Sequence, residues 1–264
     1  TPDWHPAAPN PLERALQIQP APTTGAKKGR TIAVASLKGG IGRSTLAANL
    51  AVALRQRKLG EVILAEAHYG LSHLSLLLNL HPRHALANLA TEANLDLDFV
   101  QGLLQAHQSG VRLLAAPSEL AQVVEIERET WQRTLALLPQ LAAYVIIDTA
   151  ATIDAVLSEV LIRADDILLV TGPDIASLYS TRTLLATLRA EKEMDARLHV
   201  VLNQAGGNGG LSNAVIEKHL GEKISASVLT DPPVATYALN RGIPFVLSHA
   251  RAPISRSVQK LVDH

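Results

Sequence analysis

A glycine-rich stretch between an apolar run and a helical pattern is the part of the sequence best suited to chemistry. Its residues are, in order, Lys38, Gly39, Gly40, Ile41, Gly42, Arg43, Ser44 and Thr45. The apolar run 31–37 precedes it, and 46–57 carries alanine and leucine at helical spacing. In a strand–turn–helix of this kind, backbone N–H groups and the helix N-terminus together bind phosphate. The stretch therefore predicts a phosphate-binding loop.

An aspartate at the end of a second apolar run predicts a site for Mg²⁺. Asp148 follows four apolar or aromatic residues, 144–147, which are typical of a buried strand. Ligands bind at the carboxyl ends of the strands in open α/β sheets, so this carboxylate is expected near the loop. We predict that Ser44 and Asp148 hold Mg²⁺, Asp148 through a water molecule, with Glu66 as a further candidate ligand. The alternative is that Asp148 only caps the following helix.

The order of charges in the loop departs from the usual pattern. Phosphate loops normally end Gly-Lys-Ser/Thr, whereas this one ends Gly42-Arg43-Ser44 and places its lysine early, at Lys38. Arginine keeps the positive charge, but its guanidinium is planar and longer than a lysine ammonium. Arg43 is therefore not a simple replacement for the usual lysine.

Apolar runs alternate with amphipathic segments from residue 31 onward, which predicts a parallel sheet covered by helices on both faces. The expected fold is a three-layer α/β/α P-loop NTPase fold with a mostly parallel sheet of about seven or eight strands. The predicted strands are 31–37, 61–67, 111–115, 144–148, 166–171, 198–202 and 224–229. The predicted helices are 44–57, 86–90, 95–105, 128–138, 153–163, 175–192, 211–220, 234–241 and 254–262.

Composition narrows the class of protein. The 264 residues are 47% hydrophobic and carry no net formal charge, so there is no strong sign of DNA binding. The absence of cysteine excludes thiolate metal sites, including those of iron–sulfur reductases. No apolar run reaches the roughly 18 residues of a membrane span. These features predict a cytoplasmic location.

The first 29 residues have the composition of a linker. They contain six prolines and no apolar core of a signal peptide. We expect 1–29 to be an interdomain linker after a domain of a longer chain, and 30–264 to be the domain that carries the predicted phosphate-binding loop.

The loop and three later positions resemble the ParA/MinD family of deviant P-loop ATPases. Its loop reads Lys-Gly-Gly-x-Gly-Lys-Thr/Ser, which 38–44 matches except at Arg43. Asp148 matches the family's acidic strand end, Asn203 its adenine-contacting asparagine, and Pro232 with Pro233 its later loop near the base. The resemblance implies bound ATP and Mg²⁺. It also implies a sandwich homodimer in which Lys38 reaches the partner's phosphates and takes part in catalysis.

Three stretches look most like the CpaE/TadZ branch, the pilus-assembly localisation proteins. They are 113–117, 170–178 and 238–244. In that branch a receiver-like domain precedes the ATPase, which is the domain we expect before the linker. The resemblance implies partners from a type IV (Flp/Tad) pilus or related secretion system, or pole-marking proteins. It also implies recruitment to the cell pole or the inner face of the membrane through those partners.

Two departures from the family pattern predict weak hydrolysis. Arg43 replaces the loop lysine, and His68 stands where the family has a second aspartate that positions the attacking water. His68 is either a replacement base or a histidine without a catalytic part. We expect an ATP-dependent dimer with slow or absent hydrolysis, because turnover depends on positioning at the γ-phosphate. The alternatives are an active partition or division-site ATPase and a pseudo-ATPase scaffold that binds no nucleotide.

Overall fold

The computed structural model describes residues 29–92, 94–190 and 194–263. Apart from Gly29, the predicted linker over 1–29 lies outside the described residues. The same holds for the last residues of the predicted helix 175–192.

Eight strands form one sheet, which confirms the predicted fold class. The strands are β1 (Arg30–Ala35), β2 (Val62–Ala67), β3 (Gln105–Ala106), β4 (Val111–Leu114), β5 (Tyr144–Thr149), β6 (Asp166–Thr171), β7 (Leu198–Ala205) and β8 (Ile224–Leu229). Their order is β3-β4-β2-β5-β1-β6-β7-β8, and every neighbouring pair is parallel except β3 with β4. The glycine-rich loop follows β1, so it leaves the carboxyl edge near the middle of the sheet, beside β5 and β6.

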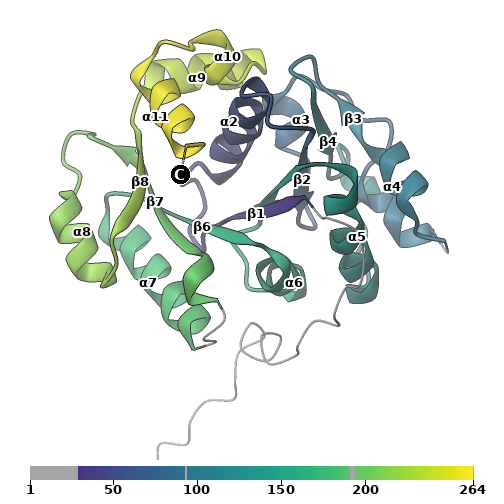
Figure 1. The fold of residues 1–264 in the computed structure, drawn as a ribbon, viewed down its shortest axis with the longest axis horizontal. Helices are drawn as coiled ribbons and strands as arrows, with labels where there is room; N and C mark the ends of the chain where they lie inside the picture. The colour runs from purple at the N-terminus through teal and green to yellow at the C-terminus, as the bar shows by residue number, and fades with distance from the viewer. Residues whose placement is uncertain (1–28, 93, 191–193, 264) are drawn as a thin grey trace, which may run out of the picture.

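Helices cover both faces of the sheet (Figure 1). One face carries α2 (Arg43–Gln56), α3 (Leu74–Leu77), α9 (Pro232–Arg241), α10 (Phe245–Ser248) and α11 (Pro253–Leu261). The other carries α4 (Leu97–Leu103), α5 (Arg128–Leu141), α6 (Ala155–Arg163), α7 (Ile175–Arg189) and α8 (Asn213–Leu220). Short 3₁₀ segments lie at η1 (Leu86–Thr91), η2 (Leu120–Gln122) and η3 (Asp195–Arg197).

Strand alternation divides the core into two layers. In β1, Ala33 and Ala35 face one layer and Val34 the other, because successive side chains of a strand point to opposite faces. Helix α2 is buried continuously from Leu46 to Leu54, since α3, α10 and α11 cover the side that does not face the sheet. The helix that begins at the glycine-rich loop is therefore the most enclosed of its layer.

The structure differs from the predicted elements mainly next to β4. The predicted helix 95–105 is shorter, because Asp96 caps α4 and the chain then turns back as β3, antiparallel to β4. Gly110, with φ of 86°, permits the tight reversal between those two strands. The short helices α3 and α10 were missed, since one helical turn carries too little periodicity to detect. In the described ranges, every helix is too short or too polar to cross a bilayer.

Candidate functional site

Two glycines give the loop its shape. Gly40 and Gly42 have φ values of 72° and 89°, a left-handed region that L side chains rarely adopt. Gly42 is the N-cap of α2, and its carbonyl accepts the first helical hydrogen bond, from the Leu46 N–H at 2.8 Å. A Cβ on Gly42 would also lie 2.6 Å from Asn203 Nδ2. This position therefore requires glycine for both reasons.

Arg43 folds back across the loop. Its Nη1 donates to the Ser36 carbonyl at 2.5 Å, so the first helical residue closes onto the last residue before the turn. Burial lowers the pKa of Arg43, and the nearby Asp148 carboxylate partly opposes that change. The guanidinium is thus held by the backbone just before the loop, with the Asp148 carboxylate nearby.

Asp148 is buried with one oxygen lacking a partner. Its residue is 1% exposed, and Oδ1 has no hydrogen-bond partner within the described residues. Burial raises the pKa of Asp148 to about 6, and Glu66, its neighbour across β2 and β5, adds to the rise. The Ser44 hydroxyl and Arg43 oppose it. A buried carboxylate oxygen without a donor fits a group that a Mg²⁺-bound water would approach.

Glu66, predicted as a further Mg²⁺ ligand, is buried and accepts hydrogen bonds from the protein itself. Its carboxylate accepts hydrogen bonds from the Ser72 hydroxyl and from the backbone N–H groups of His73, Leu74 and Ala116, at 2.6–3.0 Å. Both oxygens are therefore engaged by protein donors, and a role of Glu66 as a Mg²⁺ ligand stays a prediction. Across the described ranges, no group of three or more acidic or histidine side chains is arranged to hold a metal.

We expect Glu66→Gln to destabilise the fold without any nucleotide present. In the variant, a glutamine NH₂ would face N–H donors in place of one oxygen and leave buried groups without hydrogen-bond partners. We expect this to lower the free energy of unfolding by about 3 kcal/mol. Urea unfolding measures the change. Glu61→Gln, the same change at an exposed position before the same strand, is the matched control. An unfolding free energy for Glu66→Gln equal to that of the control would contradict the structural role.

His68 pairs with the same carboxylate. Its Nε2 lies 3.6 Å from Glu66 Oε1, and its side chain is 14% exposed. Burial lowers the pKa of His68, but the interactions with Glu66 and Asp148 outweigh it, so the net pKa is raised. His68 is thus oriented by Glu66 beside the loop, and a role as base stays a prediction.

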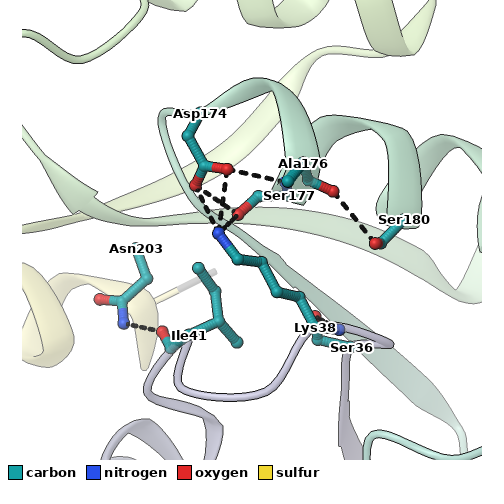
Figure 2. A network of polar contacts seen from close by, with 8 residues as sticks. All are labelled: Ser36, Lys38, Ile41, Asp174, Ala176, Ser177, Ser180 and Asn203. Atoms are coloured by element: carbon teal, nitrogen blue, oxygen red, sulfur yellow. Dashed lines mark hydrogen bonds and ion pairs between the residues drawn. The ribbon is translucent and has the colours of Figure 1, made fainter.

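Lys38 is held by the start of α7 in the same chain. Figure 2 shows its Nζ between Asp174 and Ser177, at 2.9 Å from both Asp174 oxygens and 3.0 Å from Ser177 Oγ. Burial opposes ionisation of Asp174, but Ser177 and Lys38 outweigh it and lower the pKa of Asp174 to about 2. Both charged side chains remain substantially exposed, at 35% and 47%. In the amino-acid sequence, the helix-start aspartate after β6 was the one sign of this contact.

A cavity of about 430 Å³ lies between the loop and the end of the sheet. Its lining includes Gly40, Gly42 and Thr45 of the loop, Asn203 and Gln204 of β7, and Pro232 at the start of α9. Pro233, predicted beside Pro232, is absent from this lining among the described residues. The cavity adjoins the glycine-rich loop, because Gly40, Gly42 and Thr45 form part of its wall.

The predicted site residues converge at one edge. The loop, Asp148, Asn203 and Pro232 lie at the carboxyl ends of β1, β5, β7 and the β8–α9 connection. Asp174, Ser177 and Gln204 were missed. Asp174 and Ser177 follow β6, which flanks β1, and Gln204 lies near the end of β7, which flanks β6. This position at the carboxyl edge of the sheet was the signal that could have identified them.

Comparisons with known proteins agree with this geometry. A family model described as "ParA: NUBPL iron-transfer P-loop NTPase" matches residues 27–95. The chain is similar to the septum site-determining protein MinD of Thermotoga maritima, at 27% identity over 254 residues, covering 88% of this chain and 86% of that protein.

Solved structures share the fold over nearly the whole chain. A ParA family ATPase from Chlorobium tepidum superposes with a TM-score of 0.82 at 25% identity, covering 90% of this chain and 98% of that one. The septum site-determining protein MinD from Pyrococcus horikoshii, solved with Mg-ADP, has a TM-score of 0.77 at 23% identity, covering 89% and 95%. The second likeness is one of fold alone.

Proposed function

We propose that the chain is an ATP-binding switch. Its fold is that of ParA/MinD P-loop ATPases, and the comparisons support this superfamily. ATP with Mg²⁺ is bound between the glycine-rich loop and the 430 Å³ cavity and turned over slowly. The bound state is a homodimer. The iron-transfer activity in the family model's description is not carried over, because the chain has no cysteine.

The observation that carries nucleotide binding is the unpartnered buried oxygen of Asp148 beside the loop. A buried carboxylate with a raised pKa is costly to keep unless a ligand uses it. Ser44 and Asp148 would hold Mg²⁺, the latter through water. Mg²⁺ would neutralise phosphate charge there. The loop N–H groups bind the phosphate chain, and Asn203 and Pro232 border the base.

Lys38 supports the dimer. Its ion pair with Asp174 is exposed, and exposed pairs contribute roughly 0–1 kcal/mol, so Lys38 is easily released toward another ligand. Apolar side chains are also exposed near this edge, Ile153 after β5 and Ile175 and Tyr179 on α7. Tyr179 is 74% exposed and lies four residues after the exposed Ile175 on α7, so the two form a neighbouring apolar pair that suits an interface.

Arg43 and His68 support slow turnover. The Arg43 guanidinium is engaged with the Ser36 carbonyl, and His68 is engaged with Glu66. Neither is free to meet a γ-phosphate or its attacking water without breaking that contact. The same Arg43 contact favours the nucleotide-free scaffold as a second candidate, in which the guanidinium itself fills the phosphate site.

We expect Arg43→Lys to bind ATP roughly tenfold more tightly than the wild type. Lysine keeps the charge, and ATP no longer has to displace a charge-assisted hydrogen bond worth about 1.5 kcal/mol. Calorimetry with ATP and Mg²⁺ measures the change. Arg55→Lys is the matched control, since Arg55 lies on the same helix but bonds to Gly110 and Gly60 away from the loop. Unchanged or weaker binding by Arg43→Lys would show that the guanidinium does not obstruct the site.

For the cellular role, we propose the assembly and localisation of a type IV (Flp/Tad) pilus or related secretion system. The support is the likeness of 113–117, 170–178 and 238–244 to the CpaE/TadZ branch. Recruitment to the pole or to the inner face of the membrane, from the cytoplasm, would come through partner proteins. The linker over 1–29 and a preceding receiver-like domain belong to the same proposal. The relatives named above fit an active partition or division-site ATPase equally well.

Binding and turnover, measured on the same preparation, separate the three candidates. We expect saturable ATP·Mg²⁺ binding by calorimetry and phosphate release no faster than the order of one turnover per hour, the pace of an unassisted GTPase. Rapid phosphate release would favour the partition or division-site ATPase. Absence of binding would favour the nucleotide-free scaffold.

A further inference from the structure

The side chain of Asn203 connects two parts of the site that are far apart in sequence. Its Nδ2 donates to the Ile41 carbonyl at 2.7 Å, a contact from β7 to the middle of the glycine-rich loop (Figure 2). Alternation along β7 turns Asn203 toward the α2 layer, because Leu202 faces the opposite core and Val201 faces this one. The register of β7 with β8 shifts between Leu202 and Ala205, and Gln204 there has φ of 57°. The strand therefore bends at its end.

The contact fixes one peptide of the loop. In a trans peptide, the carbonyl of Ile41 and the N–H of Gly42 point in opposite directions. Because Asn203 draws the carbonyl toward β7, the Gly42 N–H points away from β7, toward the side of β1 and β5 on which Asp148 lies. That is the side where a phosphate group would sit.

The rest of Ile41 is immobilised as well. Its side chain is 3% exposed and packs so closely on the end of β6 that a Cβ on Gly172 would lie 2.6 Å from Ile41 Cδ1. With the side chain fixed by packing, the remaining freedom of this segment is rotation of the 41–42 peptide. Gly42 makes that rotation easy, since glycine tolerates both signs of φ. The hydrogen bond from the Asn203 amide therefore sets the orientation of the 41–42 peptide.

The same amide also faces the cavity. Asn203 lines it together with Gln204 and Thr230, and one N–H and the Oδ1 acceptor remain after the bond to Ile41. A residue that only contacted the base would need no bond to the loop.

We propose that Asn203 is a positioning residue for the phosphate loop, which orients the Gly42 N–H before any ligand arrives and thereby couples the base cavity to phosphate binding. The proposal rests on the proposed function, since it concerns the same nucleotide site. It predicts that Asn203 affects ligands that have no base at all.

The test uses Mg²⁺-tripolyphosphate, which has the phosphates of ATP without the nucleoside. Asn203→Asp keeps the shape but places an acceptor against the Ile41 carbonyl, and Asn203→Ala removes the donor. We expect roughly tenfold weaker tripolyphosphate binding for the first and roughly fivefold for the second, by calorimetry. Gln140→Glu, which adds the same charge at an exposed position before β5, is the control and binds as the wild type does. The ¹⁵N–¹H signal of Gly42 shifts in Asn203→Asp, a local change that lower stability alone does not produce.

Each outcome has a distinct meaning. Wild-type affinity for tripolyphosphate in both variants, with ATP binding weakened, would overturn the proposal and leave Asn203 as a contact for the base only. Failure of the wild-type chain to bind either tripolyphosphate or ATP would overturn the proposed function, and this inference with it. If one variant does not fold by circular dichroism, the other variant and the Gly42 signal decide.

Discussion

We expect Lys38→Ala to remain monomeric in ATP and Mg²⁺ under conditions in which the wild-type chain dimerises. Each of the two copies loses one lysine contact to the partner's phosphates, and charge-assisted hydrogen bonds contribute about 1.5–3 kcal/mol apiece. Two such losses weaken dimerisation by roughly a hundredfold or more. Sedimentation velocity measures the change, while calorimetry on the same variant shows ATP binding to the monomer largely retained.

Lys218→Ala is the matched control, because Lys218 is an exposed lysine on α8 away from the loop. The competing interpretation is that Lys38 only stabilises the start of α7 through Asp174 and Ser177. That role predicts a small loss of stability, of about 1 kcal/mol or less for an exposed pair, and a normal ATP-dependent dimer. If Lys38→Ala dimerised in ATP with the affinity of the wild type, the sandwich model would be wrong.

Asp148→Asn is expected to have opposite effects on stability and on function. The raised pKa, about 6 against the ordinary 3.8, means that the folded chain disfavours the charged carboxylate at neutral pH. Removing the charge should raise the unfolding free energy by about 1–2 kcal/mol. Affinity for Mg²⁺-ATP should fall by roughly 10- to 100-fold, as for other residues that hold a metal through water. Urea unfolding and calorimetry measure the two effects.

The sign of the pH dependence follows from the same carboxyl. Protonation of Asp148 stabilises the nucleotide-free fold as pH falls through about 6, and it opposes Mg²⁺-ATP binding over the same range. Below pH 6, the affinity of the wild-type chain for Mg²⁺-ATP should therefore decrease more steeply than that of Asp148→Asn. In the variant, the titration of ATP itself still weakens binding, but that of residue 148 does not. Asp98→Asn, an exposed change on α4, should behave as the wild type. Lower stability together with unchanged Mg²⁺-ATP affinity in Asp148→Asn would assign the residue a structural role.

Much of the fold was predictable because its strands and long helices carry strong local patterns. The run 144–147 is aromatic or β-branched, and the predicted strand 144–148 forms β5 with one residue more at its end. The aspartates at 154 and 174 accept hydrogen bonds from the backbone of the helices they begin, as capping residues do. By contrast, β3 has two residues and exists only because β4 lies beside it, so no local pattern could predict it.

In the site, the places of the loop and of Asp148 at the edge of the sheet were predictable, and the hydrogen-bond partners of the side chains were not. The glycine spacing indicated phosphate binding, and Asp148 is buried at the predicted edge. The hydrogen bonds of Glu66 could not be predicted from its position alone, because its four donors come from the segment 72–74 and from Ala116 in another strand connection. The bond from Asn203 to Ile41 spans 162 positions, and a contact of that kind depends on the folded topology.

The central claim is that ATP is held between two copies of the chain and is hydrolysed slowly. Sedimentation velocity of the wild-type protein in ATP·Mg²⁺ and in ADP·Mg²⁺, with released phosphate followed in the same samples, tests it most directly. We predict a dimer in ATP that persists while little phosphate appears, and a monomer in ADP. A monomer in both nucleotides, or a dimer that disappears within minutes as phosphate accumulates, would contradict it.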